Sequence, residues 1–171
     1  MDNIWCNDRE IIRTYTNGSY TLTNSHWQYV LNNTIHFAPR FRLDSSVVPY
    51  RNASLVCQNK NDSFSTVETA IANGALTYPV GLITADEVAL AGGMRNQVNE
   101  NYYLRTNGTY FTMTTDYYSS SNVIMYGVAV DGGLTTPYHF NDHGFRPVIN
   151  LNKDVTIMRG DGTPTNPYVI E

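Results

Sequence analysis

Two apolar, strand-like blocks dominate the second half of the chain, at residues 110–113 and 123–130. Polar and aromatic residues fill the stretch between them, 114–122, which we interpret as a loop. An Asp-Gly-Gly sequence at 131–133 follows the second block and predicts a tight hairpin turn. This region is therefore expected to form a hairpin that carries a long polar loop.

A second polar loop is predicted at 134–143, ahead of a last strong apolar block at 144–151. Loops rich in Tyr, Ser, Asn and His combine stiff aromatic contact area with adaptable hydrogen bonding, as recognition surfaces do. Glycines at 159–163 predict another turn, and 168–170 reads as a final strand. The apolar blocks also supply the predicted core residues: Phe111, Met125, Val128, Val130, Phe145, Val148 and Ile149.

One helix is clearly signalled in the middle of the chain. Thr84 has N-cap chemistry and Glu87 follows three residues later, which is a capping box. Gly92 and Gly93 then provide a stop signal. The sequence therefore predicts a short helix over 85–91.

The remaining segments predict short elements with long connections. Residues 1–57 alternate small apolar runs with Asn, Ser and Gly turns, which favours short strands, and 58–66 reads as loop. Ser65 and Glu68 form a second capping box that predicts one or two helical turns. Residues 79–83 read as a buried strand that leads into the first helix.

The composition of the chain disfavours two classes of binding partner, nucleic acids and anionic membranes. Charged residues make up 15% of the 171, and the net charge of −4 shows no run of either sign. A nucleic-acid-binding face or an anionic membrane surface would call for a basic patch, so both partners are disfavoured. No apolar run approaches the ~20 residues of a membrane span. The first 20 residues also lack the apolar core of a signal peptide, so either the chain is not exported by that route or its export or anchor segment lies outside this chain. With the neutral polar composition, we favour the second alternative and expect an extracellular or surface-displayed domain.

Cysteine usage leaves two readings open. Cys6 and Cys57 could be two unpaired thiols. They could instead form a disulfide closing a loop of about 50 residues, which the chain-entropy model values at about 4 kcal/mol. We favour the disulfide.

Signals for catalysis and for metals are weak. The chain lacks a Gly-x-Ser-x-Gly elbow, a His-Glu-x-x-His pair and a phosphate-binding glycine loop. Asp142 between His139 and His143 could form an acid–base or metal cluster, but loop side chains bonded to their own turn explain these residues more simply. We therefore expect no enzyme activity, no cofactor and no metal site.

The order of blocks resembles a known family. The blocks are residues 76–88, Ala91-Gly92-Gly93, 102–104, 110–113, 144–151, Gly160-Asp161-Gly162-Thr163 and Asn166-Pro167-Tyr168. Over residues 57–171 they resemble uncharacterised extracellular domains of Firmicutes and other gut bacteria, often attached to pilin-like or other surface anchors. That family is similar in turn to the C-type-lectin-like fold, shared by formylglycine-generating-type domains and by the variable receptor-binding proteins of diversity-generating retroelements.

The resemblance implies a scaffold that holds changeable loops, and it implies no reaction. Formylglycine-generating catalysis uses cysteines late in the domain, whereas both cysteines here are early. The family pattern has Trp where this chain has Phe111, and Ser-Pro where it has Thr114-Thr115. The loop that follows the first strand is therefore expected to be remodelled in this protein.

We therefore expect one α+β, irregular β-rich, C-type-lectin-like domain over 1–171, with N-terminal strands and loops at 1–57 and the family-matching core at 58–171. The expected function is surface-displayed ligand recognition through loops 114–122 and 134–143, with retroelement diversification as a sharper variant. The partner would be a protein or glycan on another cell or surface. A structural pilin-like or wall-associated subunit that self-associates is the alternative. The candidate ligand-binding residues are Thr115, Asp116, Tyr117, Tyr118, Ser120, Asn122, Thr135, Tyr138, His139, Asn141, Asp142 and His143.

Overall fold

The computed structural model describes residues 4–9, 11–16, 19–23, 30–31, 34–44, 52–57, 59–65, 76–78, 80–119, 122–149, 151, 154–163 and 165–171. Before residue 80 the elements are β1 (Ile4–Cys6), β2 (Ile11–Thr16), β3 (Ser19–Thr23), β4 (Val30–Leu31), β5 (Thr34–His36), α1 (Ala38–Leu43), the 3-10 turn η1 (Lys60–Asp62) and β6 (Ser63–Ser65). After it come β7 (Val80–Leu82), α2 (Ala85–Leu90), β8 (Tyr110–Ser119), β9 (Asn122–Val128), β10 (Leu134–Thr135), β11 (Gly144–Phe145), β12 (Pro147–Ile149), β13 (Ile157–Arg159) and β14 (Val169–Ile170).

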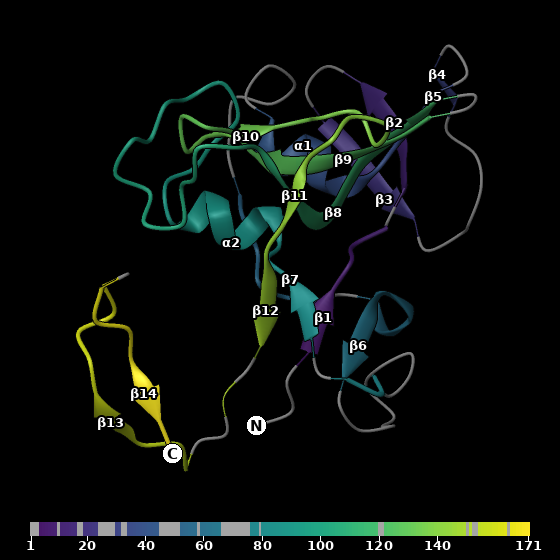
Figure 1. The fold of residues 1–171 in the computed structure, drawn as a ribbon. Coiled ribbons are helices and arrows are strands. Elements are labelled where there is room, and N and C mark those ends of the chain that lie inside the picture. The colour runs from purple at the N-terminus through teal and green to yellow at the C-terminus, as the bar shows by residue number, and fades with distance from the viewer. Residues whose placement is uncertain are drawn as a thin grey trace.

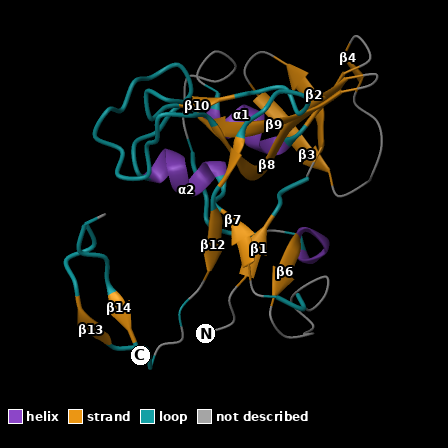
Figure 2. Ribbon diagram, in the orientation of Figure 1, coloured by secondary structure: helices purple, strands orange, loops and turns teal. Residues whose placement is uncertain are grey.

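A curled sheet organises the structure. Its strands run in the order β10-β9-β8-β5-β4, and β11 pairs in parallel with the start of β8. The other strands form two-stranded pairs: β1 with β6, β2 with β3, β7 with β12, and β13 with β14. Figure 1 shows β7, β12, β1 and β6 on one side of α2 and the large sheet on the other. The expected class, β-rich with short helices, is confirmed at this level (Figure 2).

The predicted loop at 114–122 is wrong over most of its length, because β8 continues through it to Ser119 and β9 begins at Asn122. Thr114 is 1% exposed and accepts a 2.9 Å hydrogen bond from the Ala85 backbone N–H. Buried polar groups of this kind are tolerated when they are hydrogen-bonded inside the fold. The polar composition of the segment thus reflects internal bonding rather than exposure to solvent.

Helix α2 forms where its capping box predicts it. The Thr84 hydroxyl accepts from the Glu87 N–H at 3.2 Å, and Glu87 Oε2 accepts from the Thr84 N–H at 2.7 Å. The helix stops before Gly92, whose φ of +89° favours glycine. The second predicted capping box extends beyond Ser65 into residues outside the described part of the chain.

Helix α1 was not predicted from the sequence. Pro39 lies in its first turn, where the missing N–H costs nothing. Ala38, Pro39, Phe41 and Leu43 are buried. Six residues cannot sustain a helix on propensity alone, so tertiary contacts must stabilise it. Its two arginines supply such contacts, as described below.

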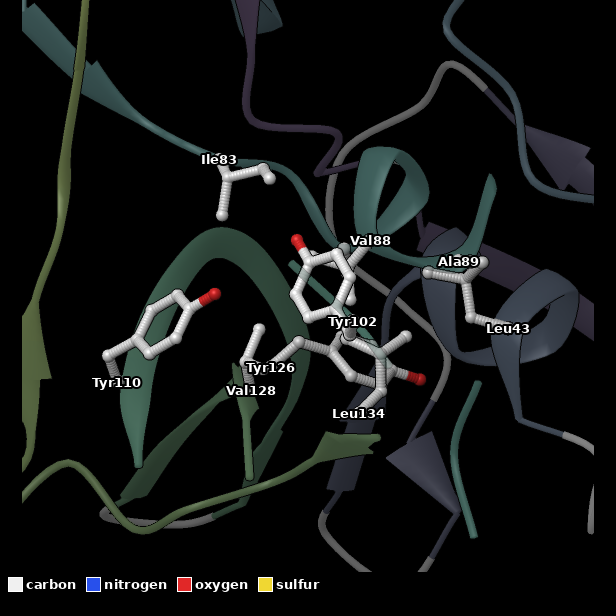
Figure 3. Packing of buried hydrophobic residues seen from close by; sticks show 10 residues of the cluster. Leu43, Ile83, Val88, Ala89, Tyr102, Tyr110, Tyr126, Val128 and Leu134 are labelled. Atoms are coloured by element: carbon white, nitrogen blue, oxygen red, sulfur yellow. The ribbon is translucent and has the colours of Figure 1, made fainter. Parts of the chain in front are cut away.

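The principal core lies between the helices and the sheet, and its central rings and branched side chains meet in Figure 3. It contains Leu43, Ile83, Ala85, Val88, Ala89, Tyr102, Tyr110, Tyr126, Val128 and Leu134. Of the predicted core residues, Phe111 and Val128 are buried. The prediction is wrong for Val130, Phe145 and Ile149, which are 51%, 68% and 58% exposed. Val80 in β7 is also 47% exposed, so that strand forms as expected without being buried.

A disulfide joins Cys6 at the end of β1 to Cys57, and this pairing is confirmed. In the described part of the chain, no helix has the length and apolar character needed to cross a bilayer. Arg146 links β11 and β12 to the core. Its guanidinium donates to the Leu104 carbonyl oxygen at 2.6 Å and lies over the ring of Tyr110.

The predicted C-terminal turn and strand are present as well. Gly160 and Gly162 have φ of +98° and +82°, and β14 pairs with β13. Figure 1 shows this hairpin apart from the rest of the fold. Its apolar side chains at Ile157 and Met158 are 59% and 60% exposed.

Candidate ligand-binding surface

The end of the β8–β9 hairpin lies beside the loop that follows β10. Tyr118 pairs with Val123 across the hairpin, and Tyr138 forms an isolated antiparallel bridge with Ile124 on the other edge of β9. The His139 Nδ1 atom is 3.1 Å from the Val123 carbonyl oxygen. Because a carbonyl oxygen can only accept, this contact requires the proton on Nδ1. The two segments that the sequence singled out therefore meet around the start of β9.

Aromatic rings gather on the loop of residues 136–143, which we call the aromatic loop. Tyr138 and Phe140 stack with ring centroids 5.1 Å apart and an angle of 22° between their planes. His139 meets Phe140 edge-on at 5.4 Å. Tyr138 and Phe140 are nevertheless 47% and 65% exposed. A pre-stacked pair that stays open to solvent offers rigid contact area at low entropic cost.

The sheet holds the aromatic loop in place. Gly127 lies beneath it, and a Cβ there would be 2.9 Å from Pro137 Cγ. At the far end, the Gly144 N–H donates to the Thr109 carbonyl oxygen at 2.9 Å. His143 and Phe145 both contact the buried ring of Phe111, with centroids 5.3 and 5.5 Å away. The loop is thus anchored at both ends and packed against the sheet between them.

The hairpin half of the predicted site is mostly interior. Thr115 and Asp116 are 7% and 0% exposed, so they do not belong to a ligand-facing surface. Tyr117 is half-buried, with its ring under the Arg40 guanidinium at 5.5 Å and beside His36 at 5.8 Å. The prediction of a solvent-facing cluster here is therefore corrected to a structural one. Tyr118, at 37% exposure, is the aromatic residue of this strand that reaches the surface.

Two arginines and two aspartates meet beneath the hairpin. Asp116 Oδ2 accepts from Arg40 at 2.9 Å and lies 3.7 Å from Arg95, which also pairs with Asp44. Burial raises the pKa of Asp116, while Arg40 and Arg95 oppose that shift. Burial, followed by the charge of Asp116, also raises the pKa of Tyr126. Such a cluster fixes the arrangement of α1 against β8, and its aspartates are fully buried.

The remaining predicted residues divide by position. Asn141 and Asp142 are exposed on the aromatic loop, and Asn141 closes its turn by donating from its N–H to the Tyr138 carbonyl oxygen at 3.1 Å. Asn122, Thr135 and His143 are half-buried. Ser120 lies outside the described residues. The exposed residues at the start of β9 and on the aromatic loop form one candidate binding surface. We call it the aromatic surface, and it consists of Tyr118, Val123, Tyr138, His139 and Phe140.

Sequence reasoning missed Phe140, although it stands within the predicted loop. Its neighbours on both sides are polar. An apolar residue isolated in this way within a polar loop is more often exposed than part of the core. Reasoning also missed a cavity far from this loop, of about 190 Å³, bordered by Asp8, Arg42 and Asp86. These three residues come from distant parts of the chain, so no local pattern could have joined them.

Within the described ranges, no group of three or more His, Cys, Asp or Glu side chains has an arrangement that would hold a metal ion. No protein-family model matches the chain, and neither a curated protein nor a solved structure matches it significantly.

Proposed function

We propose that this protein is a non-catalytic recognition domain, displayed outside the cell, that binds its ligand through the aromatic surface. The observation that carries the proposal is the stacked pair Tyr138–Phe140, which is anchored on the sheet and yet exposed. Binding hot spots are enriched in aromatic side chains on rigid supports. The disulfide between Cys6 and Cys57 supports an oxidising compartment, where such bonds persist.

Replacing Tyr138 and Phe140 together by Ala tests this. Surface substitutions usually change the free energy of unfolding by less than about 0.5 kcal/mol. We therefore expect the melting temperature to stay within about 2 °C. Loss of an aromatic hot spot of about 2 kcal/mol lowers affinity about 30-fold. The assay is binding of the labelled monomer to glycan and protein arrays, followed by titration of any hit.

Tyr78 provides a matched control because it is 77% exposed and lies before β7 rather than on the aromatic loop. Tyr78→Ala should leave both stability and binding unchanged. A large fall in melting temperature for the double variant would mean that the two rings are structural. Array binding that survives the double variant would place the ligand elsewhere and defeat the proposal.

A C-type-lectin-like scaffold, diversified by a retroelement, is the finer form of this proposal. Loop residues such as His139, Asn141 and Asp142 suit variation because their side chains are exposed. Asp116 does not, since its change would disturb the buried arginine pairs. A near-identical template repeat beside the gene, differing at adenines that map to these exposed positions, would support the idea. Differences concentrated at buried positions would count against it.

An assembly subunit is the second candidate, favoured by the β13–β14 hairpin. An isolated two-stranded hairpin is marginally stable in water, and this one exposes Met158 and Ile170 by 60% and 44%. A second copy of the chain could cover those residues. Sedimentation velocity tests this: a concentration-dependent dimer that is lost in Met158→Asp would favour assembly. A monomer at all concentrations would favour recognition.

A further inference from the structure

The cavity noted above is bordered by β8 of the large sheet and by the strand pair β7–β12. Its walls come from β1, α1, the segment 54–56, β7, the start of α2, β8 and β12, and Cys6 of the disulfide forms part of them. It has a volume of about 190 Å³. None of the aromatic-surface residues lines it, so a ligand here would be independent of the proposed recognition site.

Charge on the walls is unbalanced. Asp8, Asp86 and Glu87 face the cavity together with one cation, Arg42. Arg42 is already committed: its Nε and Nη2 donate to Asp86 at 2.7 and 2.8 Å, and its Nη1 donates to Asp8 at 2.6 Å. Hydrogen bonds and charge from Asp86, then from Asp8, raise the pKa of Arg42 despite its burial. Among the described residues that line the cavity, acidic side chains therefore outnumber cations by three to one, and that one cation, Arg42, is already paired.

Acceptor capacity remains on the carboxylates. Glu87 uses one oxygen, Oε2, for its bonds to the Thr84 N–H and hydroxyl at 2.7 and 2.8 Å. Asp86 Oδ1 receives Arg42 and the Ser54 N–H, whereas Oδ2 receives a single N–H. An ionised carboxylate offers about four lone-pair sites. The cavity can thus accept hydrogen bonds from a cationic donor without breaking the existing ones.

Apolar groups complete the site. Leu82 and Val148 line the cavity, and Leu55 and Val56 stand at its border with 67% and 70% of their surface exposed. A volume below the roughly 300 Å³ of typical ligand pockets admits a group the size of one side chain. An apolar wall beside acceptor oxygens matches a methylene chain that ends in an ammonium group. A metal ion would leave this apolar wall without a partner.

We infer that this cavity binds a primary alkylammonium group, which a lysine side chain of a partner protein or a free polyamine could supply. The ammonium lies among Asp8, Asp86 and Glu87, and its methylenes lie against Leu55 and Val56. Binding is electrostatic in part, so it weakens as salt is raised.

Titration followed by amide chemical shifts tests the inference directly. The probes are Nα-acetyl-lysine methylamide, its Nε-acetylated form, putrescine and glutarate. We expect saturable shifts at Ser54, Val56, Thr84 and Asp86 with the two amines, and none with Nε-acetylated lysine or glutarate. Tighter binding of the blocked lysine than of putrescine indicates a protein side chain as the natural source. The reverse order indicates a free polyamine.

Glu87→Gln removes one wall charge while glutamine can keep the capping box. It should weaken amine binding about threefold to fivefold. Glu100→Gln is the control, because Glu100 is exposed and lies outside the cavity lining. It should change nothing. Absence of shifts at tens of millimolar amine, or equal shifts with the Nε-acetylated probe, would overturn the inference without any variant having to fold. Neither result bears on the aromatic surface.

Discussion

Arg42→Met should be among the most damaging single changes to this fold. The substitution keeps a long flexible side chain but removes all three N–H bonds to Asp86 and Asp8. The Asp86 side chain is 6% exposed, and among the described residues outside α2 it would retain only the Ser54 N–H as a donor. Breaking a buried ion pair by removing one partner costs about 3–5 kcal/mol, because the other charge stays buried.

That cost is large beside a total stability of roughly 5–15 kcal/mol. For a chain of this length each kcal/mol lowers the melting temperature by about 2–4 °C. We therefore expect the melting temperature to fall by about 6–20 °C in calorimetry, with a matching loss of about 3–5 kcal/mol in urea unfolding at pH 7.

Arg9→Met is the matched control. Arg9 also pairs with a buried aspartate, Asp62, but its own side chain is 48% exposed. Asp62 Oδ2 also accepts from the Arg9 backbone N–H at 3.0 Å, and that bond survives the substitution. An exposed pair of this kind contributes about 0–1 kcal/mol. Equal losses for the two variants, or a loss below 1 kcal/mol for Arg42→Met, would refute the argument from burial.

Three further predictions concern stability. Replacing both Cys6 and Cys57 by Ser should cost about 2–5 kcal/mol in urea unfolding, and reducing agent should then no longer lower the stability of the variant. Burial, and then Arg40, lower the pKa of His36 to about 4 in the folded state. Stability should therefore fall as pH drops from the unfolded pKa near 6.5 toward 4, and His36→Gln should reduce that slope; an unchanged slope would contradict the assignment. Gly132→Ala should destabilise by more than about 1 kcal/mol, since φ is +80° and the new Cβ would be 2.0 Å from the Asn99 carbonyl oxygen. Gly108→Ala, which meets nothing within 4 Å, should be nearly neutral, and equal effects of the two glycine changes would disprove the steric explanation.

Features with local causes could be read from the sequence. The Thr84–Glu87 capping box is a contact between residues three positions apart, so the sequence motif alone specifies its geometry. The turn at Gly132 is equally local, because it depends on a backbone conformation that glycine permits.

Features that depend on contacts between residues far apart in the sequence could not be predicted from local patterns. Helix α1 depends on Arg40 and Arg42, whose partners Asp116 and Asp86 lie 76 and 44 residues further along the chain. The same distance explains why Asp116 resembled a loop residue: its arginines are invisible in a local window. Phe145 was predicted to be buried because its side chain is apolar. It is exposed because the two short strands β11 and β12 leave it uncovered.

For the candidate site, composition located the aromatic loop but not its limits. Tyr138 and His139 lie at the surface as a polar neighbourhood suggested, whereas Thr115 shares that neighbourhood and is buried. Thr115 is buried because β8 carries it into the sheet, and the path of β8 is set by its pairing with β5 and β9. Pairing partners are properties of the whole fold.

The bond between Cys6 and Cys57, which are 51 positions apart in the sequence, closes residues 6–57 into a covalent ring. A protease that cuts once inside this ring opens it without releasing a fragment, and the two pieces remain one molecule until a reductant acts. Where peptidases are abundant and thiols are scarce, a nicked copy would therefore keep its two parts together.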